Sequence, residues 1–282
     1  MDPIASLLML LMGIIAGLFG ALLGIGGGVI IIPCLVMFFG FGIKEAIAVS
    51  IVSVVATSIA GASRYVDQRM TNVRLGMFLE TATTAGAVSG ALLTIKVSSS
   101  LLYLMMGLLL IYLSISQIST RGSEEEKLRK DLFIGKEDEL ARKLSLSNSY
   151  PDIAEGKEVK YTVVRTKSGL IASYLAGMIS AMLGVGGGII KVPIMNQLMN
   201  VPMKAAVATS KFMIGVTAST GALLYLAHGL IDEEAVAPVA IGVMIGATVG
   251  TSVMNKMKAS SIKLAFGLLL LYFAYNMIIR GI

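Results

Sequence analysis

The chain carries one glycine-rich motif twice. The first copy, GALLGIGGGVIIIP, occupies residues 20–33, and the second, SAMLGVGGGIIKVP, occupies residues 180–193, at an offset of 160 residues. Three successive glycines in an apolar segment leave backbone N–H and C=O groups uncovered, which a bilayer tolerates only where protein buries them or a wet cavity surrounds them. The motif therefore predicts a membrane protein whose helices are interrupted at two related places.

The same offset holds without a gap far beyond the motif. Identical residues fill equivalent positions in the two halves: Lys44 and Lys204, Ser50 and Ser210, Thr57 and Thr217, Gly86 and Gly246, and Tyr112 and Tyr272. An ungapped repeat of this length indicates one membrane unit that was duplicated and fused. Duplicated bundles with Gly- or Pro-interrupted segments at matching positions are typical of secondary transporters.

Composition agrees with a membrane protein and excludes several other classes. Hydrophobic residues make up 56% of the chain, charged residues 14%, and the mean hydropathy is +0.84, as in polytopic membrane proteins. The single Cys34 and single His228 argue against a disulfide framework and a metal site. No basic run interleaved with aromatic residues suggests nucleic-acid binding. We expect neither a metal nor a cofactor.

Apolar segments recur in the same order in both halves. They lie at about 4–23, 29–40, 44–63, 75–95 and 101–118, and again at about 168–183, 189–199, 204–226, 235–254 and 263–279. A spanning helix needs about 20 residues, so the short segments 29–40 and 189–199 are predicted to be half-helices or re-entrant arms that meet at the midplane. We predict an all-α polytopic membrane protein with membrane repeats at 1–118 and 168–282, joined by a charged linker at 119–167.

Charges in the connections predict the orientation of each half. Arginines place residues 64–74 in the cytoplasm, whereas the equivalent connection, 226–234, has acids and no Lys or Arg and is predicted to be external. Lysines in turn place residues 255–263 inside. Equivalent connections on opposite sides predict two inverted-topology repeats of about five helical segments each. The protein would then lie in the cell membrane with both termini outside and the linker inside.

The linker holds more than half of the charged residues of the chain, with acids and bases nearly balanced. Residues 124–146 could form a surface helix, and residues 157–167 alternate enough for a short strand pair. Two interpretations stay open at this point. The linker is either a solvated connector or a small regulatory or partner-binding module.

The glycine breaks are the first candidate binding site. A half-helix that begins after each break would direct free N–H groups and the positive end of its dipole at a central space. Two such ends would suit a small anion, whereas the alternative is that the glycines only permit close packing. The candidate residues are Gly26, Gly27 and Gly28 with Pro33, and Gly186, Gly187 and Gly188 with Pro193.

Two lysines of the second half have no counterpart in the first. Lys191 follows the second break where the first half has Ile31, and Lys211 replaces Ile51. Charges inside a bilayer are costly and are functional candidates by default. Both could neutralise a bound anion, or they could snorkel to the interface.

Hydroxyl groups gather on the segments that follow the breaks, and one acid lies within an apolar segment. The candidate hydroxyls are Ser50, Ser53 and Thr57 in the first half, and Thr209 and Ser210 in the second. They could hydrogen-bond an oxyanion or bridge packed helices. Glu80 could carry a coupling proton or pair with Arg64, but its position near the cytoplasmic end favours the interface.

The paired pattern G-x-G-G-G-x-I-x-x-P followed by A-x-x-x-S, present as GIGGGVIIIP…KEAIAVS and GVGGGIIKVP…KAAVATS, resembles the sulfite exporter TauE/SafE family of membrane permeases. The resemblance covers nearly the whole chain apart from the linker. It implies export or uptake of sulfite, sulfonates or related organic anions, and it places both glycine triplets, both prolines and both repeat serines, Ser50 and Ser210, in the family's central region. Lys191 and Lys211 are not part of the pattern.

The residues and the resemblance together predict a secondary transporter that exports small anions, sulfite or organosulfonates foremost, by alternating access. Energy would come from a proton or ion gradient, or from the anion's own gradient. The alternatives are a channel-like anion facilitator and a membrane sensor or scaffold that acts through the linker. No HExxH, GxSxG or GxxxxGK[ST] motif supports an enzyme or an ATP-driven pump.

Overall fold

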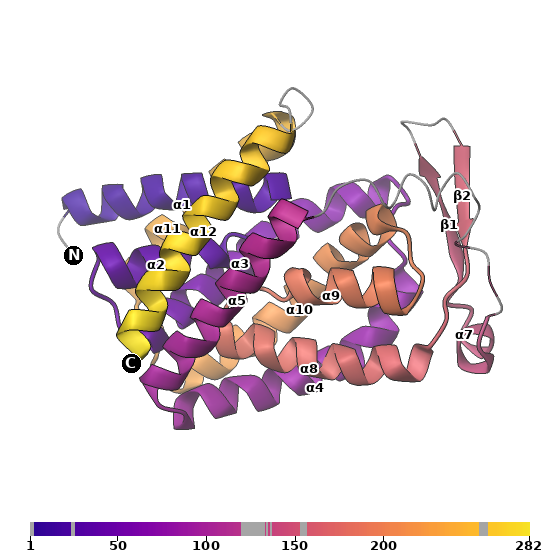
Figure 1. Ribbon diagram of the computed structural model, residues 1–282, viewed down its shortest axis with the longest axis horizontal. Helices are drawn as coiled ribbons and strands as arrows, with labels where there is room; N and C mark the ends of the chain where they lie inside the picture. The colour runs from indigo at the N-terminus through magenta and orange to yellow at the C-terminus, as the bar shows by residue number, and fades with distance from the viewer. Residues whose placement is uncertain are drawn as a thin grey trace.

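The computed structural model describes residues 3–23, 26–119, 133, 135, 137–152, 157–253 and 259–282, with the side chains of 21–23, 60–64, 117–119, 152, 250–253 and 259–265 excepted. Five helices form the first half: α1 (Pro3–Leu23), α2 (Gly28–Phe38), α3 (Ile43–Asp67), α4 (Val73–Lys96) and α5 (Ser99–Ser119). The second half contains α8 (Thr166–Leu183), α9 (Gly188–Pro193), the π-helical turn η1 (Ile194–Leu198), α10 (Met203–Ala227), α11 (Glu233–Val253) and α12 (Ala259–Gly281). Figure 1 shows them as one bundle.

The predicted all-α polytopic architecture is confirmed. Four helices in the described part are long and apolar enough to cross a membrane, at Pro3–Gly20, Val73–Lys96, Ser99–Ser116 and Met203–Ala227. The segment after the first break, α2, has only 11 residues, in line with a half-helix. After the second break, α9 ends at Pro193 and is followed directly by η1, whereas α2 continues past the equivalent Pro33.

Helix pairs related by the 160-residue offset pack in the same way. Helix α1 packs along α11, and its equivalent α8 packs along α4, while α3 packs on α10 and α5 on α12. A Cβ added at Gly86 of α4 would lie 2.0 Å from the carbonyl oxygen of Tyr174 in α8. One added at the equivalent Gly246 of α11 would lie 2.0 Å from the carbonyl oxygen of Ile14, the equivalent of Tyr174. Glycines therefore bring the two pairs of backbones into the same close contact, as small residues do in membrane bundles.

The described linker residues form a small structured unit, which we call the linker module: α7 (Glu139–Lys143), β1 (Asn148–Asp152) and β2 (Lys157–Tyr161). The strands pair antiparallel, with Asn148 opposite Tyr161. The strand pair expected within 157–167 was misplaced, because only β2 lies there and α8 begins at Thr166. Of the helix expected over 124–146, the described residues contain α7, and 124–132 lie outside the description.

The linker module packs against the membrane helices. Its buried side chains, among them Tyr150 and Tyr161, share one hydrophobic cluster with Leu75 of α4 and with Met195 and Met199 in and after η1. Its contact with η1 is notable, because η1 continues the arm that follows the second glycine break. The module is therefore in contact with the arm and does not hang free in solvent.

Asn72, in the connection between α3 and α4, joins the module to the bundle. Its Nδ2 donates to the carbonyl oxygen of Leu146 at 2.7 Å and to the hydroxyl of Tyr161 at 2.9 Å. Its Oδ1 accepts from the backbone N–H of Leu75 and so caps α4. The arginine-containing connection and the linker, both predicted to be cytoplasmic, thus lie at the same end of the molecule.

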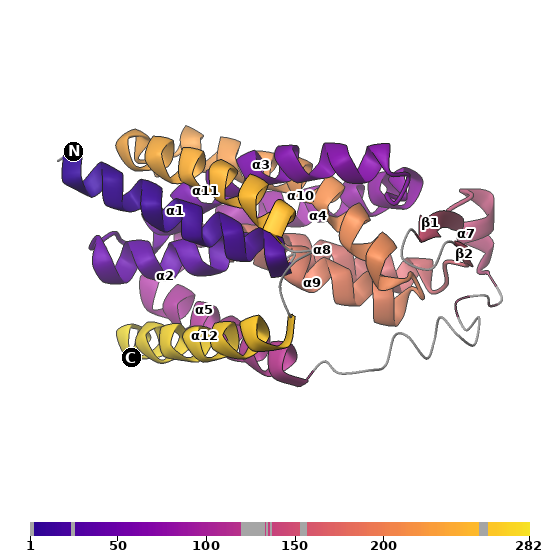
Figure 2. The same cartoon turned by 90° about the horizontal axis from the view of Figure 1, so that it is seen from above.

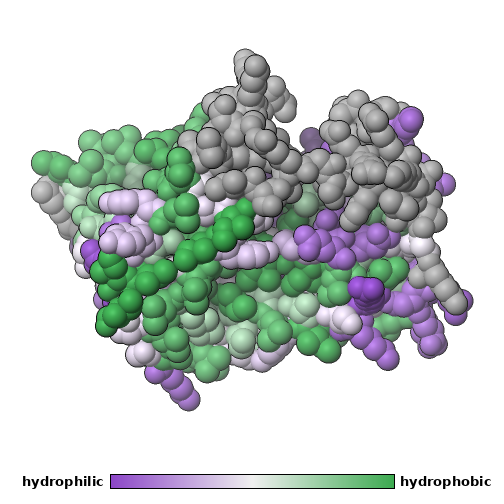
Figure 3. Space-filling view, in the orientation of Figure 1, coloured by the Kyte–Doolittle hydropathy of each residue, from purple (hydrophilic) through white to green (hydrophobic). Residues whose placement is uncertain are grey.

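Figures 1 and 2 show both chain termini at the end of the bundle opposite the linker module. On the face seen in Figure 3, hydrophobic residues cover most of the helical bundle, and hydrophilic residues gather toward the module. Exposed apolar side chains such as Leu108, Ile171 and Leu223 are 63–67% accessible, which would be unfavourable if they faced water. A lipid-facing surface accounts for them.

Substituting Gly86→Ala should destabilise the protein, because the new Cβ would collide with a backbone oxygen of α8. Overpacking of this kind costs about 1–3 kcal/mol, so we expect a lower thermal midpoint in detergent. Gly215→Ala is the matched control within a helix, since its nearest neighbour is the Ser58 Oγ at 3.2 Å, a side chain that can shift. An equal loss in both variants would contradict the close α4–α8 contact.

Docking of the linker module should weaken at alkaline pH. Burial raises the pKa of Tyr161 to about 12, against a smaller opposing effect of its hydrogen bond with Asn72. Because the folded-state pKa lies above the unfolded one, this contribution to stability is complete below about pH 10 and is lost as the pH rises through 12. A difference of two pKa units corresponds to about 3 kcal/mol. Tyr161→Phe should lack this part of the pH dependence of the thermal midpoint, and an unchanged profile would refute the assignment.

Candidate functional site: the glycine breaks and a buried Glu–Thr–Lys cluster

The two glycine breaks, distant in sequence, touch each other. A Cβ at Gly28, the first residue of α2, would lie 2.4 Å from the carbonyl oxygen of Gly184 and 3.0 Å from the Cα of Val185, both at the second break. The hydroxyl of Ser50 on α3 donates to the same Gly184 oxygen at 2.7 Å. The structure therefore brings together the first break, the second break and one repeat serine, all buried.

Backbone conformation explains why glycine occupies the breaks. Gly26, Gly186 and Gly187 have φ values of +74°, +78° and +73°, which other residues rarely adopt. Gly27 differs from its equivalent Gly187, with φ at −60°. The breaks are thus related but not identical, and each turns the chain sharply before a short helix.

The helix starts at both breaks carry no side-chain cap. Gly27 precedes α2 and Gly187 precedes α9, and neither position supplies a side-chain hydrogen bond to the first turn. The positive end of the α2 dipole therefore lies at the contact between the breaks without a neutralising side chain. Gly28 and Gly187 are also tightly packed, because an added Cβ would lie 2.4 Å from the Gly184 oxygen and 2.8 Å from the Ser180 Oγ, respectively. The alternative that the glycines permit close packing therefore applies as well.

Lys191 lies on α9, one turn after the second break, and is 1% exposed. Its Nζ donates to Thr217 Oγ1 of α10 at 2.6 Å and lies 3.7 Å from Glu80 Oε2 of α4. Thr217 Oγ1 in turn donates to Glu80 Oε1 at 2.6 Å. We call Glu80, Thr217 and Lys191 the buried cluster. Its three residues come from three helices and from both halves of the chain.

The structure gives Glu80 a partner that the sequence analysis did not name. Glu80 is only 7% exposed, and its ionic partner is Lys191. The Arg64 side chain lies outside the described residues, so the pairing with Arg64 and the position at the membrane interface stay predictions. Hydroxyl groups of Thr83 and Thr84 also donate to its carboxylate, at 2.8 and 3.1 Å. Helix α4 packs on both α8 and α10, which buries residue 80 inside the protein.

Lys191 is buried, which excludes snorkelling in this conformation. Its stem passes the second break: a Cβ at Gly187 would lie 3.3 Å from the Lys191 Cε and 2.8 Å from the Ser180 Oγ. A side chain at Gly187 would thus collide with Ser180 and crowd the lysine stem. The break and the buried cluster form one continuous region.

Lys211 does not join this region. It is half-buried on α10, and its Nζ lies 4.7 Å from the centre of the Tyr65 ring, a cation–π contact. Its carbonyl oxygen accepts the hydroxyl of Ser58. The two unmatched lysines therefore have different partners, although the sequence favoured one site for both.

Most of the candidate hydroxyls already bind the protein backbone. Ser53 donates to Val49 at 3.0 Å and Thr57 to Val54 at 2.9 Å. Thr209 accepts the backbone N–H of Asn72 at 3.0 Å. The hydroxyl of Ser210 is buried and has no hydrogen-bond partner in the described part of the chain. Ser50 thus bridges packed segments, because it donates to the Gly184 carbonyl oxygen. The Ser210 hydroxyl makes no such bond to the described residues.

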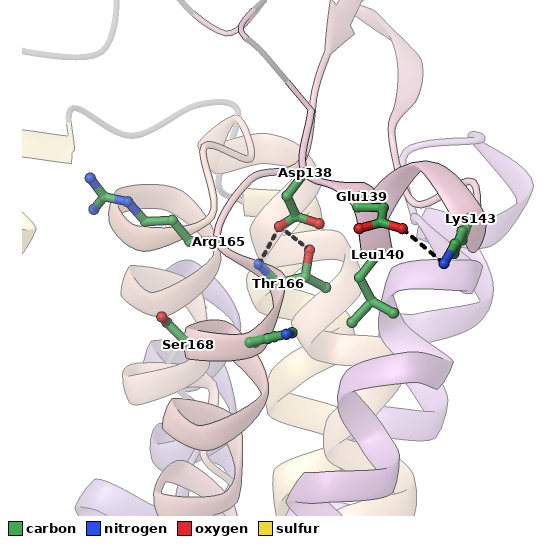
Figure 4. Close-up of a pocket in the computed structure, with 8 residues that line it drawn as sticks. Asp138, Glu139, Leu140, Lys143, Arg165, Thr166 and Ser168 are labelled. Carbon is green, nitrogen blue, oxygen red and sulfur yellow. Dashed lines mark hydrogen bonds and ion pairs between the residues drawn. The ribbon is translucent and has the colours of Figure 1, made fainter.

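A second concave region lies on the linker module. Figure 4 shows it between the start of α7 and the first turn of α8, lined by Asp138, Lys143, Arg165 and Thr166 among others. The Asp138 carboxylate already has structural partners. It caps α7 by accepting the Ala141 backbone N–H at 2.7 Å, and it accepts the Thr166 backbone N–H at 2.6 Å. Burial alone would raise the pKa of Asp138, but hydrogen bonds from Thr166 and from the start of α7 outweigh it and hold the pKa below its ordinary value. We assign this region to anchoring the module.

Thr217 is the residue of the buried cluster that sequence reasoning missed. The sequence showed it as the repeat equivalent of Thr57 and as one of the hydroxyls after the second break, but it was not among the predicted binding residues. The available signal was the coincidence of one acid and one base, Glu80 and Lys191, inside apolar segments of opposite halves. The free-energy cost of two opposite charges inside a bilayer is much lower when the two side chains pair with each other.

Comparisons with known proteins agree with this architecture. The family model described as "Sulfite exporter TauE/SafE" matches residues 9–277. The chain is 23% identical to the "Probable membrane transporter protein YunE" of Bacillus subtilis over 98% of each chain. It is 29% identical to YdhB of the same organism, over 94% of this chain and 98% of the relative. It is 24% identical to MJ0441 of Methanocaldococcus jannaschii, over 78% and 72%. YdhB and MJ0441 are likewise described as probable membrane transporter proteins. No solved structure matches the chain.

The ion pair of the buried cluster should appear as a coupling energy. Lys191→Met alone leaves a buried carboxylate without its counter-charge and should cost about 3–5 kcal/mol. The double variant with Glu80→Gln should lose clearly less than the two single losses together, as measured by unfolding in mixed detergent micelles. Lys211→Met is the matched control and should combine additively with Glu80→Gln; coupling of equal size in both pairs would argue against the contact.

Proposed function

Since the chain belongs to the sulfite exporter TauE/SafE family, whose relatives are described as membrane transporters, we propose that it is a secondary transporter of small anions. The observation that carries this proposal is the meeting of the two glycine breaks beside a buried lysine. An uncapped helix start and an ammonium group both favour a negative ligand.

The binding region that we propose extends from the breaks to Lys191. It includes Gly26 to Gly28, Gly186 to Gly188, Ser50 and Ser210, of which Ser210 has a buried hydroxyl without a partner among the described residues. Ser53, Thr57, Thr209 and Lys211 belong to its periphery, since each is engaged elsewhere. Oxyanions suit this set because it offers N–H, O–H and ammonium donors and the carboxylate of Glu80 as its one acid.

Alternating access supplies the transport step. The equivalent packing of α1 on α11 and of α8 on α4 supports two halves related by an inverted repeat, which is the arrangement that rocks around a midplane site. The close contact of Gly28 with Gly184 must open during such a movement. We place the linker module in the cytoplasm and both termini outside the cell, as the charges of the connections predict.

Sulfite and organosulfonates are the substrates that we propose, on the basis of the family. If the anion crosses alone, a membrane potential that is negative inside favours exit by about 2.3 kcal/mol per charge per 100 mV. Export is then the direction that needs no further energy source.

Labelled sulfite should enter proteoliposomes containing the purified protein in a saturable manner, with competition by taurine, sulfoacetate or sulfate. Preloaded unlabelled sulfite should accelerate this entry, because a carrier exchanges its substrate across the membrane. Gly187→Leu should abolish the flux, since the side chain would enter the space of Ser180 and Lys191 at a positive φ. Gly215→Ala should transport as the wild type does.

The outcomes separate the alternatives. Flux without saturation or exchange would identify a channel-like facilitator. Absence of flux for every sulfur oxyanion and carboxylate, with the protein folded, would refute the transport of such anions. A sensor or scaffold that acts through the linker module would then be the function to test.

A further inference from the structure

The ammonium group of Lys191 is incompletely satisfied. A lysine ammonium has three N–H donors, and in the described part of the chain one of them has an acceptor at hydrogen-bond distance, Thr217 Oγ1. The carboxylate of Glu80 lies at 3.7 Å from Nζ, well beyond the 2.7–2.9 Å typical of a charge-assisted hydrogen bond. A buried cation that keeps donors unused is costly unless another group uses them.

Glu80 is the better satisfied partner. Its carboxylate accepts hydroxyl groups from Thr83, Thr84 and Thr217 at 2.6–3.1 Å. Two of these hydroxyls, those of Thr83 and Thr217, also have a backbone carbonyl oxygen within reach, at 3.1 Å in each case. The pocket of Glu80 therefore suits a carboxylate and can accommodate a protonated carboxyl group with little rearrangement.

The charge balance of the buried cluster connects these two facts. With one ammonium and one carboxylate the cluster is neutral. An anion bound to the free donors of Lys191 would add a second negative charge beside Glu80, in a region of low dielectric where like charges repel strongly. One proton on the carboxylate of Glu80 restores neutrality, and the proton and the anion would then enter and leave together.

We propose that Glu80 is the proton-coupling residue of this transporter: an anion that binds at Lys191 takes the place of ionised Glu80 as the counter-charge, and Glu80 binds one proton. This inference rests on the proposed transport function and specifies its energetics. The proton comes from the compartment that supplies the anion and is released in the other one. Transport is therefore an electroneutral symport of one proton with each singly charged anion.

Other charged and titratable groups on the surrounding helices have their own partners or lie at a distance. On α8, the hydroxyl of Tyr174 donates to Ser89, and Lys167 lies in the first turn. On α10, Lys211 lies over the Tyr65 ring, Tyr225 donates to the Ala181 carbonyl, and Lys204 lies in the first turn, about 20 Å along the helix from Thr217. On α4, Arg74 and Lys96 lie at the two ends. Within the described residues, the one ionic partner of Glu80 is Lys191.

Electroneutral symport changes what drives the anion. The membrane potential no longer pushes the anion outward, because no net charge crosses. The direction follows from the anion gradient together with the pH gradient, and an acidic exterior opposes export. Net export then requires an outward anion gradient larger than the inward proton gradient.

The test uses wild-type proteoliposomes in which potassium and valinomycin hold the membrane potential at zero. The probe is labelled methanesulfonate, which stays ionised across the working pH range, with sulfite in parallel. An interior made one pH unit more alkaline than the exterior should drive accumulation of about tenfold, because one pH unit is equivalent to 1.36 kcal/mol. Equal concentrations inside and outside, in vesicles that exchange the same probe, would overturn the proposal.

Glu80→Gln tests the residue itself. Glutamine keeps the shape of a protonated carboxyl group, so this variant should retain exchange of labelled for unlabelled anion while accumulation under the pH gradient is lost. Glu139→Gln is the matched control, since Glu139 is exposed in the linker module and pairs with Lys143; it should accumulate the probe as the wild type does. Accumulation that persists in Glu80→Gln would refute the role of Glu80.

The outcomes keep this inference apart from the proposed function. Exchange without accumulation in the wild type rejects proton coupling but leaves a carrier of small anions. Absence of exchange for both probes rejects the anion carrier and the coupling with it. If Glu80→Gln does not fold, the wild-type measurement at zero potential still decides, and Glu80→Asp should then change how the initial rate of uptake depends on pH while the final accumulation stays the same.

Discussion

The structure depends on the requirement that no backbone polar group face lipid without a partner. Each glycine triplet interrupts a membrane segment, and the freed N–H and C=O groups must be enclosed by protein. The contact between the breaks meets that requirement: Gly28 lies against Gly184, and Ser50 from the first half hydrogen-bonds the freed carbonyl of the second. Neither half encloses its own break completely, so the duplicated chain needs both halves.

Glycines also allow the membrane helices to pack closely. Gly86 and Gly246 let α4 approach α8 and α11 approach α1 until a Cβ would collide with a backbone oxygen. These contacts hold each half against the other along two equivalent seams. Between these seams lies the buried cluster, whose three residues are drawn from α4, α9 and α10.

The linker module adds an asymmetry that the membrane repeats lack. It packs against η1 and the start of α10, and Asn72 joins it to α4. The arm that carries Lys191 therefore lies between the buried cluster on one side and the module on the other. A movement of α9 and η1 during transport would therefore change the contacts between η1 and the linker module.

The sequence by itself determined the membrane class, the all-α architecture, the short helix after the first break and the family. These follow from apolar segment length, glycine spacing and an ungapped offset, all of which are local or periodic properties of the chain. The sequence also identified Lys191 as unusual. Only the tertiary structure decided what Lys191 faces: Glu80 is 111 positions away on α4, and Thr217 stands on a third helix. A contact between two buried charges depends on helix rotation and on which helices pack together, which the packing of the complete bundle sets. The same reason separates Lys211 from Lys191 and turns a linker of balanced charge into a docked module.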